Sequence, residues 1–312
     1  MKISVAMATY NGEKFIEQQL RTILDQTLPP DEVIICDDGS KDNTVKLVQK
    51  FIQENDLSRK WKLIQNSENQ GYIQNFIHAI ALTSGDYIFL SDQDDIFYPE
   101  KFAVMVRFME RHEDCLLLNA DFESIDASGE KVHSFRSKRR RQKAARKLTF
   151  DDWLYESCFP GFSMCFRESL KEDIIKADIT HCYGHDILIG LLAVNRGGNY
   201  SINEILSGYR IHDHNTTGGT NVVNNYSMSS RTSQKKQELQ EYSLLEQMLE
   251  DNRLSHIDVS FIERRKKDLC RRIKSLEEES LSKALGNFFI CQCYPKNTLA
   301  GDILYIGKGK LK

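Results

Sequence analysis

The sequence predicts an α/β protein with a mostly parallel sheet flanked by helices, followed by a helical C-terminal region. Three observations predict this class: short apolar runs alternate with helical patterns over the first hundred residues, polar residues follow each apolar run, and charged amphipathic segments occupy the last third of the chain. The 312 residues, of which 40% are hydrophobic and only 5 are proline, allow a large core and exclude a collagen-like or low-complexity chain.

Four short runs rich in Ile, Val, Leu and aromatic residues are predicted to be buried strands, because polar residues follow each of them. They occupy residues 3–8, 32–36, 61–65 and 87–90. Apolar residues at helical spacing fill the three gaps, at residues 15–24, 45–52 and 76–81. Right-handed crossovers make such strands parallel and bring their carboxyl ends to one edge, where open α/β sheets bind ligands.

The following part of the chain mixes helices and strands. We expect helices at residues 99–112 and 168–177 and a helix that begins at His185, with strands at residues 116–119 and 204–211. Residues 214–233 are rich in Gly, Asn, Ser and Thr, which indicates a boundary.

The expected domain organisation follows from that boundary. It consists of a catalytic domain at residues 1–217, with halves at about 1–98 and 99–217, and a linker with a helical region at residues 218–312. Amphipathic patterns at residues 234–284 predict a pair of long helices that pack on the catalytic domain or on a second copy of the chain, which would give a homo-oligomer.

Charge is nearly balanced along the chain, with one exception. The formal net charge of -3 excludes a whole-molecule field that attracts nucleic acid. A basic run at residues 136–147 holds eight Lys and Arg residues. Such a run is most often a solvated loop or helix face; the alternatives are binding of a phosphate-bearing acceptor and peripheral contact with anionic lipid on the inner face of the cell membrane. Aromatic residues do not alternate with these cations, which disfavours a nucleic-acid site.

The apolar segments are too short for a membrane span, which takes ~18 or more consecutive apolar residues. The apolar start also meets Glu13 and Lys14 too early for a secretory signal. We therefore expect a cytoplasmic protein.

Three carboxylates follow the fourth predicted strand directly, at Asp92, Asp94 and Asp95. Their mutual repulsion would be costly without a cation or hydrogen-bond donors among them. Mg²⁺ and Mn²⁺ prefer such oxygen ligands, and Mg²⁺ typically combines one or two carboxylates with phosphate oxygens, so a diphosphate is the expected ligand. The alternative is that these acids form a turn or cap the next helix.

Four motifs occur in order at the ends of the four predicted strands. They are Ala8-Thr9-Tyr10-Asn11-Gly12, then Cys36-Asp37-Asp38-Gly39-Ser40 with Asp42 and Thr44, then Asn69-Gln70-Gly71 with Asn75-Phe76, and finally Ser91-Asp92-Gln93-Asp94-Asp95. With these motifs the chain resembles the bacterial family 2 glycosyltransferases of the GT-A fold over about residues 3–217. Gly184-His185-Asp186 and Tyr209-Arg210-Ile211-His212 make it most similar to the rhamnosyltransferase-like members that build surface polysaccharides.

The resemblance implies a UDP- or dTDP-sugar donor and a Mn²⁺ or Mg²⁺ cofactor. Asp38 would accept from the uracil or thymine N3–H, and the metal would be held by Asp94, with Asp92 and His212 as further ligands. The implied donor-binding residues are Thr9, Tyr10, Asn11, Asp37, Asp38, Asn69, Gly71, Asn75, Asp92 and Gln93. Two alternatives stay open here: Asp37 would instead form a turn that caps the next helix, and His212 would have a purely structural role.

The resemblance also implies a catalytic base and an acceptor side. Asp186 would take the proton from the attacking hydroxyl, and its alternative is a charge at a helix N-terminus. The residues implied on the acceptor or diphosphate side are Asp95, Phe162, His185 and Arg210. A core position for the aromatic ring and a structural hydrogen bond for His185 are the alternatives.

The expected function is inverting, metal-dependent transfer of one sugar to a glycan or a polyprenyl-diphosphate-linked glycan in the assembly of surface polysaccharide. A catalytically inactive glycan- or lipid-binding module is one alternative. A nucleotide-dependent oxidoreductase is a weaker one, because the first strand is followed by Ala-Thr-Tyr-Asn-Gly rather than by a G-x-G-x-x-G phosphate loop.

Overall fold

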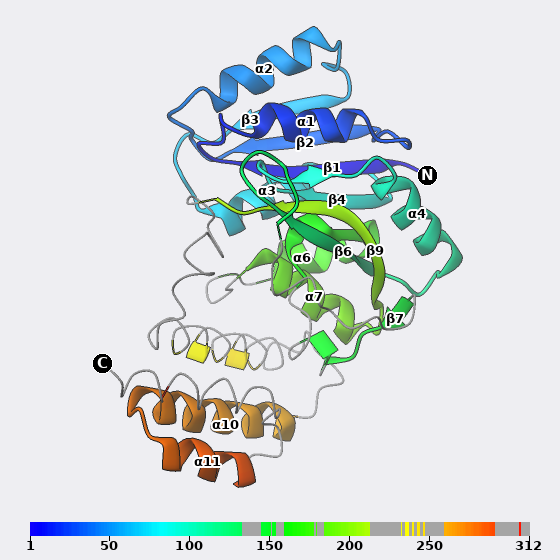
Figure 1. Cartoon of the computed structure of the whole chain (residues 1–312). Coiled ribbons are helices and arrows are strands. Elements are labelled where there is room, and N and C mark those ends of the chain that lie inside the picture. The colour runs from blue at the N-terminus through cyan, green and yellow to red at the C-terminus, as the bar shows by residue number, and fades with distance from the viewer. Residues whose placement is uncertain are drawn as a thin grey trace. The chain divides into compact units, whose positions relative to one another are not determined.

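The structure is a computed structural model, shown in Figure 1. It describes residues 1–132, 145–150, 152–153, 159–177, 179, 184–212 and 259–290, and in addition residues 232, 235–236, 239, 242–243, 246 and 306. The chain forms two compact units, the first made of residues 1–179 and 184–212 and the second of residues 180–183 and 213–312. The expected boundary at residue 217 stays a prediction.

The first hundred residues alternate strand and helix. The elements are β1 (Ile3–Thr9), α1 (Ile16–Leu24), β2 (Glu32–Asp37), α2 (Thr44–Glu54), β3 (Trp61–Gln65), α3 (Tyr72–Leu82) and β4 (Tyr87–Ser91). All residues of β1, β2 and β4 are buried, which is why their sequences are continuous apolar runs rather than alternating ones. The helices bury one stripe each; α1 buries Ile16, Leu20 and Ile23 at steps of three and four.

The rest of the first unit completes the sheet. Its elements are β5 (Ile96–Phe97), α4 (Lys101–Arg111), β6 (Leu117–Ile125), β7 (Ala145–Lys147), β8 (Met164–Arg167), α6 (Lys171–Lys176), α7 (His185–Asn195) and β9 (Asn199–Arg210), with single 3-10 turns η2 (Gly161–Ser163) and η3 (Glu168–Leu170). The predicted helix at residues 99–112 and the helix that begins at His185 are confirmed.

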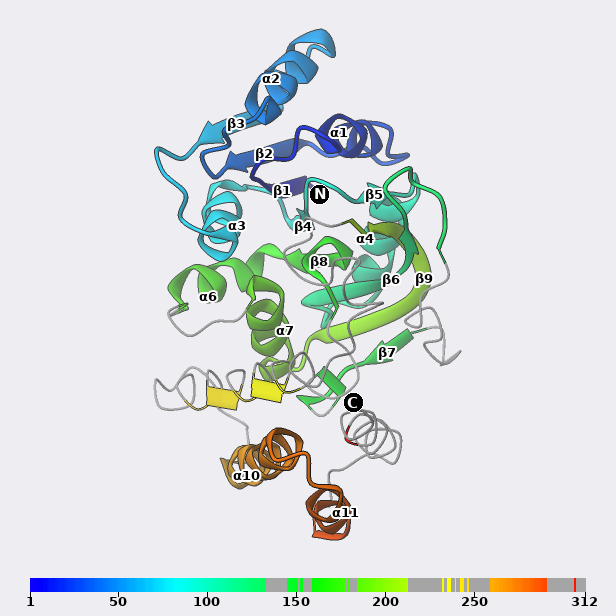
Figure 2. The same ribbon diagram turned by 60° about the vertical axis from the view of Figure 1, so that its left-hand side comes forward.

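The strands form one sheet in the order β3-β2-β1-β4-β8-β6-β9-β5, with β7 beside β9. Strands β1 to β4 are parallel, and β8 is antiparallel to both β4 and β6. Figure 2 shows α3, α6 and α7 on one side of the sheet and α1 and α4 on the other. Because the strand order reverses between β1 and β4, the carboxyl ends of these two strands flank the position where open α/β sheets bind ligands. The predicted α/β class is confirmed.

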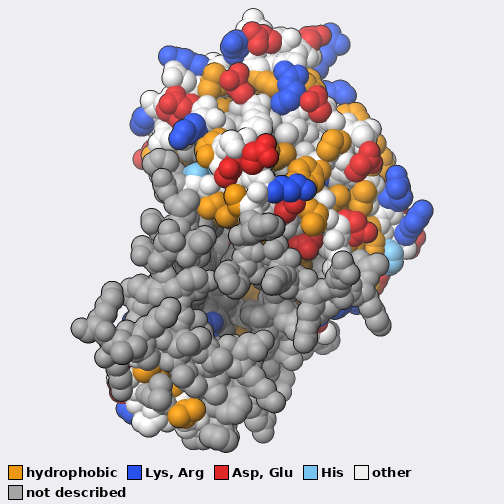
Figure 3. Space-filling model, in the orientation of Figure 1, with side chains coloured by type: hydrophobic (Ala, Val, Ile, Leu, Met, Phe, Trp, Pro, Cys, Tyr) orange, Lys and Arg blue, Asp and Glu red, His pale blue; other side chains and the backbone are white. Residues whose placement is uncertain are grey.

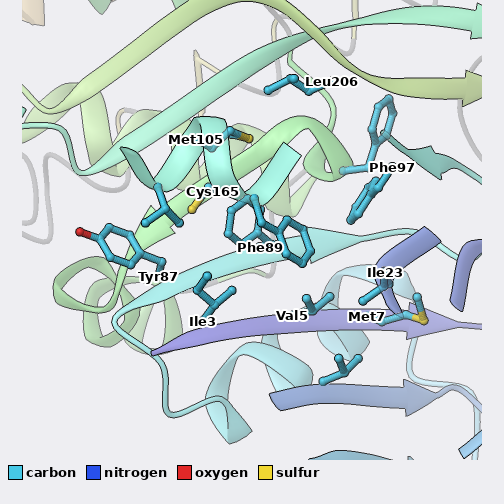
Figure 4. Packing of buried hydrophobic residues seen from close by; sticks show 14 of the residues in the cluster. Ile3, Val5, Met7, Ile23, Tyr87, Phe89, Phe97, Met105, Cys165 and Leu206 are labelled. Carbon is cyan, nitrogen blue, oxygen red and sulfur yellow. The ribbon is translucent and has the colours of Figure 1, made fainter. Parts of the chain in front are cut away.

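The core lies between the sheet and the helices α1 and α4. Figure 4 shows Val5 and Met7 of β1 and Phe89 of β4 packed with Phe97 and Met105. Phe89 and Phe102 contact each other with ring centroids 4.2 Å apart. Each fully buried side chain of this size contributes roughly 1.5–3 kcal/mol through the hydrophobic effect, so this packing holds β1 and β4, and the polar loops that follow them, in a fixed position.

The second unit contains α10 (Val259–Glu277) and α11 (Leu281–Ile290). In α10 the residues Ile262, Leu269, Ile273 and Leu276 are buried at helical spacing, which agrees with the amphipathic pattern expected there. Most of residues 234–258 lie outside the described residues, and so do Asn215 and Gly218. The homo-oligomer expected from these helices stays a prediction. Among the residues that the structure describes, no helix is both long and apolar enough to cross a membrane.

Charged side chains of both signs are mixed on the face seen in Figure 3, as the nearly neutral composition leads one to expect. Of the basic run at 136–147, residues 136–144 lie outside the described residues. Arg146 and Lys147 lie on β7, where they form ion pairs with Asp152 at 3.0 Å and with Asp114 at 2.8 Å. These two cations therefore have acidic partners within the fold.

Candidate active site

The loop after β2 is held by the carboxylate of Asp37. The Thr9 hydroxyl at the end of β1 donates to its Oδ2 at 2.9 Å, and the backbone N–H of Ser40 donates to its Oδ1 at 2.9 Å. Asp37 is buried. Both oxygens thus accept from neighbouring loops, which is the turn-forming arrangement that the sequence left open for this residue.

Asp38 is also buried, and it accepts three hydrogen bonds from the segment between β3 and α3. The donors are the backbone N–H groups of Gln70 and Gly71, each at 2.9 Å, and the side-chain amide of Asn66 at 3.0 Å. Gly71 has a φ of +89°, a conformation that a side chain would strain. The carboxylate of Asp38 therefore shapes the loop that leads into α3.

Asn75 and Asn69 support the same loop. The buried amide of Asn75 donates to the backbone carbonyl of Cys36 at 2.8 Å and accepts from Asn66 at 2.9 Å, so it joins α3 to the end of β2. The Asn69 side chain accepts from the backbone N–H of Gly71 at 3.1 Å. The structure thus brings these predicted donor-binding residues together at the carboxyl edge of the sheet.

The side-chain amide of Gln93 holds the loop that follows β1 through two hydrogen bonds with the backbone of Tyr10. Its Oε1 accepts from the backbone N–H of Tyr10 at 2.8 Å, and its Nε2 donates to the backbone carbonyl of Tyr10 at 2.9 Å. A Cβ atom on Gly12 would lie 2.2 Å from Gln93 Oε1, so only glycine leaves room for this amide. Asn11, at φ +49°, completes the turn by accepting from the backbone N–H of Lys41 at 2.8 Å. The Tyr10 ring itself is 45% exposed.

The acids after β4 have a different environment. Burial, followed by the negative charges of Asp94 and Asp186, raises the pKa of Asp92 to about 8. Burial and the charges of Asp94 and Asp92 raise the pKa of Asp95 well above its usual range, although Arg210 opposes the shift. Carboxylates that repel one another in this way favour a cation among them.

Asp186 joins this cluster from a distant part of the sequence. It lies in the first turn of α7, where its Oδ1 accepts from the backbone N–H of Ile187 at 2.9 Å. Burial nevertheless outweighs these N–H groups and raises the pKa of Asp186 to about 6. This value still lies below 7, so the group is mostly ionised at neutral pH.

Asp94 and His212 form a direct pair, with His212 Nε2 2.8 Å from Asp94 Oδ2. A carboxylate oxygen and an imidazole nitrogen are ligands that suit Mn²⁺, and Mg²⁺ and Mn²⁺ sites commonly gain their other ligands from phosphate and water. Among the described residues, no group of three or more His, Cys, Asp or Glu side chains is arranged to hold a metal ion. The residues present therefore fit a metal that a diphosphate completes, rather than a site built by protein alone.

Arg210 and Phe162 lie inside the protein. Arg210 is fully buried; its Nε donates to the backbone carbonyl of Asp94 at 2.7 Å and its backbone N–H donates to Asp95 Oδ1 at 3.0 Å. Phe162 belongs to the core, with its ring stacked on Tyr209 at 5.6 Å between centroids. The core position that the sequence left open for the aromatic ring agrees with the place of Phe162, and the acceptor- or diphosphate-side roles of both residues stay predictions.

His185 is buried next to Asp186. Its ring stacks on Phe76 with centroids 3.8 Å apart, and a Cβ atom on Gly161 would lie 2.5 Å from its Nε2. Within the part of the chain that the structure describes, neither ring nitrogen has a hydrogen-bond partner. Burial lowers the pKa of His185 to about 3, so the imidazole is neutral.

Lys101 is a buried residue that sequence reasoning missed. Its Nζ donates to the Ser207 hydroxyl at 2.8 Å and lies 4.6 Å from the centroid of the Phe97 ring. Burial lowers the pKa of Lys101 to about 7, while Cys165 and Asp95 act in the opposite direction. Lysine at the start of an amphipathic helix normally faces solvent, so no local signal in the sequence marks it as buried.

The chain has the GT-A fold. Its features here are a mostly parallel sheet, a strand order that reverses between β1 and β4, and acidic residues at the carboxyl edge of the sheet. The family model for glycosyl transferase family 2 matches residues 4–174, which is more than half of the chain. The chain therefore belongs to glycosyl transferase family 2. The predicted resemblance is confirmed, and the oxidoreductase alternative is excluded.

Two curated relatives show the level of similarity. The putative glycosyltransferase EpsE of Bacillus subtilis is 34% identical over 128 residues, which are 41% of this chain and 45% of EpsE. The dTDP-rhamnosyl transferase RfbG of Shigella flexneri is 32% identical over 178 residues, which are 54% of this chain and 55% of RfbG. The chain spans about half the length of these relatives.

Solved structures resemble the chain over a larger share. TarS of S. aureus in complex with UDP-GlcNAc has a TM-score of 0.59 and 19% identity, covering 87% of this chain and 72% of TarS. The mannosyltransferase PcManGT of Pyrobaculum calidifontis, in complex with GDP-Man and Mn²⁺, has a TM-score of 0.60 and 15% identity, covering 99% of this chain and 87% of PcManGT. These likenesses establish the fold.

Proposed function

We propose that the chain transfers one sugar, with inversion, from a UDP- or dTDP-sugar to a hydroxyl group of a glycan or lipid-linked glycan, with the help of a divalent metal. The observation that carries this proposal is the electrostatic coupling of Asp186 on α7 to Asp92 after β4. A carboxylate more than ninety positions away in the sequence thus raises the pKa of Asp92 at the carboxyl edge of the sheet. A base and a cation-binding group are the two functions that sugar transfer from a diphosphate requires.

The donor nucleotide is proposed to bind where β1, β2 and the loop before α3 meet. The relative RfbG is a dTDP-rhamnosyl transferase, and TarS is solved with UDP-GlcNAc. A carboxylate has about four acceptor positions, and the described residues supply three donors to Asp38. One position is left for the imide N–H of uracil or thymine, which guanine and adenine cannot offer in the same geometry.

The metal is proposed to be Mn²⁺ or Mg²⁺ held by Asp94 and His212, with Asp92 beside them. When bound, such an ion neutralises the charge that develops on the diphosphate leaving group. Asp94 and His212 already lie 2.8 Å apart. Besides burial, the negative charges of Asp94 and Asp186 raise the pKa of Asp92, and these two charges support a cation at this point. PcManGT, with the same fold, is solved with Mn²⁺.

Asp186 is proposed to accept the proton of the acceptor hydroxyl. The bond from the acceptor oxygen to the anomeric carbon forms while the bond from that carbon to the diphosphate oxygen breaks, and the proton moves to the Asp186 carboxylate. A pKa of about 6 leaves this carboxylate ionised at neutral pH but a stronger base than an ordinary aspartate. Attack on the face opposite the leaving group inverts the anomeric centre.

The acceptor is proposed to approach His185. Its neutral imidazole, stacked on Phe76, has hydrogen-bonding capacity that the described residues do not use, and it precedes the proposed base directly. A glycan hydroxyl would satisfy a ring nitrogen of this kind. Phe162 supports this side from within the core rather than by stacking on the sugar.

Thermal-shift measurements test the donor and the metal together. The panel contains UDP-glucose, UDP-galactose, UDP-GlcNAc and dTDP-rhamnose, with GDP-mannose as the purine control, each with Mn²⁺ and with EDTA. We expect a rise in Tm with at least one uracil or thymine donor that is larger with Mn²⁺ than with EDTA. Equal shifts with GDP-mannose, or no shift with any donor, would overturn the proposal.

Turnover separates an enzyme from an inactive binding module. Release of nucleoside diphosphate from the donor with the largest shift, measured with Mn²⁺, should depend on Asp186. Binding without any release, in the presence of glycan acceptors, would favour the binding module instead.

A further inference from the structure

Arg210 connects three segments around the acidic loop. Its Nε donates to the backbone carbonyl of Asp94 at 2.7 Å, its Nη1 to the carbonyls of Asp126 at 3.1 Å and Ala127 at 2.9 Å, and its Nη2 to Gln18 Oε1 at 2.8 Å. The side chain is fully buried. Guanidinium has five N–H groups, so at least four are committed to protein acceptors.

The ring of Phe15 links this arginine to His212. The guanidinium carbon of Arg210 lies 4.8 Å from the Phe15 centroid, and the His212 ring lies 4.8 Å from the same centroid, tilted by 33°. Phe15 immediately precedes α1 and is only half-buried. Phe15 therefore makes a cation–π contact with Arg210 and a ring–ring contact with His212.

Arg210 and Phe15, which contact each other, thus restrain both members of the Asp94–His212 pair. Arg210 holds the backbone of Asp94 through its carbonyl, and Phe15 limits the rotation of the His212 ring. The backbone N–H of Arg210 also donates to Asp95 Oδ1, so the strand end and the acidic loop cannot separate without breaking charge-assisted bonds.

We infer that Arg210 is a positioning residue for the Asp94–His212 pair, supported by Phe15 and Gln18, and that it does not bind the donor diphosphate. This inference rests on the proposed metal role of Asp94 and His212. To reach a phosphate, the guanidinium would have to leave four hydrogen bonds and a buried site, each bond being worth about 0.5–1.5 kcal/mol or more for a charged donor. Residues that orient metal ligands typically change metal affinity by about 10–100-fold when they are removed.

The test uses Phe15→Leu, because this change keeps an apolar side chain and replaces none of the proposed nucleotide or metal ligands. Phe108→Leu is its matched control: Phe108 is also half-buried and stacks on a histidine, His112, at 4.1 Å, but on α4. Mn²⁺ affinity in the presence of UDP, and UDP affinity in EDTA, are measured by isothermal titration calorimetry for the full-length chains. Circular dichroism reports whether each variant is folded.

We expect Phe15→Leu to weaken Mn²⁺ binding about tenfold while UDP affinity in EDTA changes less than about twofold. Phe108→Leu should change neither quantity. Unchanged Mn²⁺ affinity in Phe15→Leu, with normal Mn²⁺ binding by the wild type, would overturn the inference alone. A wild type whose nucleotide binding shows no effect of Mn²⁺ would overturn the metal role and the inference together.

Arg210→Lys tests the diphosphate alternative without any metal. If Arg210 bound the diphosphate, the variant would lose the preference for UDP over UMP in EDTA. We expect the ratio of the two affinities to stay within about twofold of the wild-type value, because the group that is changed does not touch the phosphates. A collapse of this preference in a folded variant would overturn the inference. If that variant does not fold, Gln18→Leu, which removes one acceptor of the guanidinium, is measured for Mn²⁺ affinity in the presence of UDP, and an unchanged Mn²⁺ affinity would overturn the inference.

Discussion

The aspartates after β2 and those after β4 lie at the same edge of one sheet, yet their surroundings are opposite. Asp37 and Asp38 accept hydrogen bonds from backbone and side-chain donors at 2.9–3.0 Å. Asp92 and Asp95 instead have pKa values raised by burial and by neighbouring carboxylates. Asp186 belongs with the second group, since burial raises its pKa too.

The difference teaches which acids build the site and which are available for chemistry. A carboxylate that accepts several hydrogen bonds from the protein stabilises the loops around it, and in Asp38 one acceptor position remains for the proposed donor base. A carboxylate whose charge is poorly compensated gains from a cation or a proton, and such groups concentrate at functional sites. Replacing members of each group should therefore separate catalysis from stability.

The largest effect is expected for Asp186→Asn. The amide keeps the hydrogen bond from the Ile187 N–H but cannot accept a proton, so transfer should fall by about 10²–10⁴-fold, measured as release of nucleoside diphosphate. Affinity for UDP should stay within about twofold. Turnover equal to that of the wild type would remove Asp186 from the role of base.

Asp94→Asn should have the next largest effect, on metal rather than on fold. Loss of one charged ligand of the proposed site should weaken Mn²⁺-dependent donor binding by about 10–100-fold, as measured by titration with and without Mn²⁺. Asp114→Asn serves as the control, because that exposed acid pairs with Lys147 on β7. A response to Mn²⁺ that survives in Asp94→Asn would contradict the assignment.

Asp38→Asn should lower stability in addition to any loss of donor affinity. The new amide group would face one of the N–H donors that now share the carboxylate, which should lower the free energy of unfolding by about 1–3 kcal/mol in urea denaturation. Glu68→Gln, in the same loop but exposed, should change it by less than about 0.5 kcal/mol. Equal stability of the two variants would show that the three hydrogen bonds contribute nothing.

The smallest predicted effect is a dependence on pH. The pKa of Asp186 is about 6 in the folded protein, above the ordinary value of 3.8, so the folded state binds more protons and the wild type loses stability as the pH rises from 4 through 6. Asp186→Asn lacks this loss and should be more stable than the wild type by about 1–2 kcal/mol at pH 7.5, after allowance for solvent screening. The difference in stability between Asp186→Asn and the wild type should vanish near pH 4. A difference that stays constant with pH would show that it does not come from the titration of Asp186.

The sequence predicted the parallel half of the sheet well, because continuous apolar runs such as Ile3–Ala8 have few other uses in a globular chain. It also located the acidic edge, since Asp92 and Asp94 follow a buried strand directly. The proposed role of Asp186 came from the family motif alone, because nothing in the neighbouring sequence indicates that this residue acts on Asp92.

Other features could not be predicted, because their partners are far apart in the sequence. Gln93 holds a backbone 83 positions away, and Arg210 donates to Gln18 across 192 positions. Lys101 looks like a solvent-facing helix residue and is buried only because Ser207 and Phe97 of other elements surround it. Each of these contacts depends on tertiary packing, which local periodicity does not encode.

Gln93 fixes the backbone of the loop after β1 without contacting the side chain of Tyr10 through its hydrogen bonds. The conformation of this loop therefore does not depend on which side chain stands at position 10. Both backbone polar groups of Tyr10 are bonded to the Gln93 amide, while the Tyr10 ring points outward with 45% of its surface exposed. A library of substitutions at position 10 should therefore vary the surface offered to an incoming molecule on an unaltered scaffold. Position 12 has no such freedom, since a Cβ atom there would lie 2.2 Å from Gln93 Oε1. Directed evolution toward new sugar donors would accordingly begin at residue 10 and leave residue 12 as glycine.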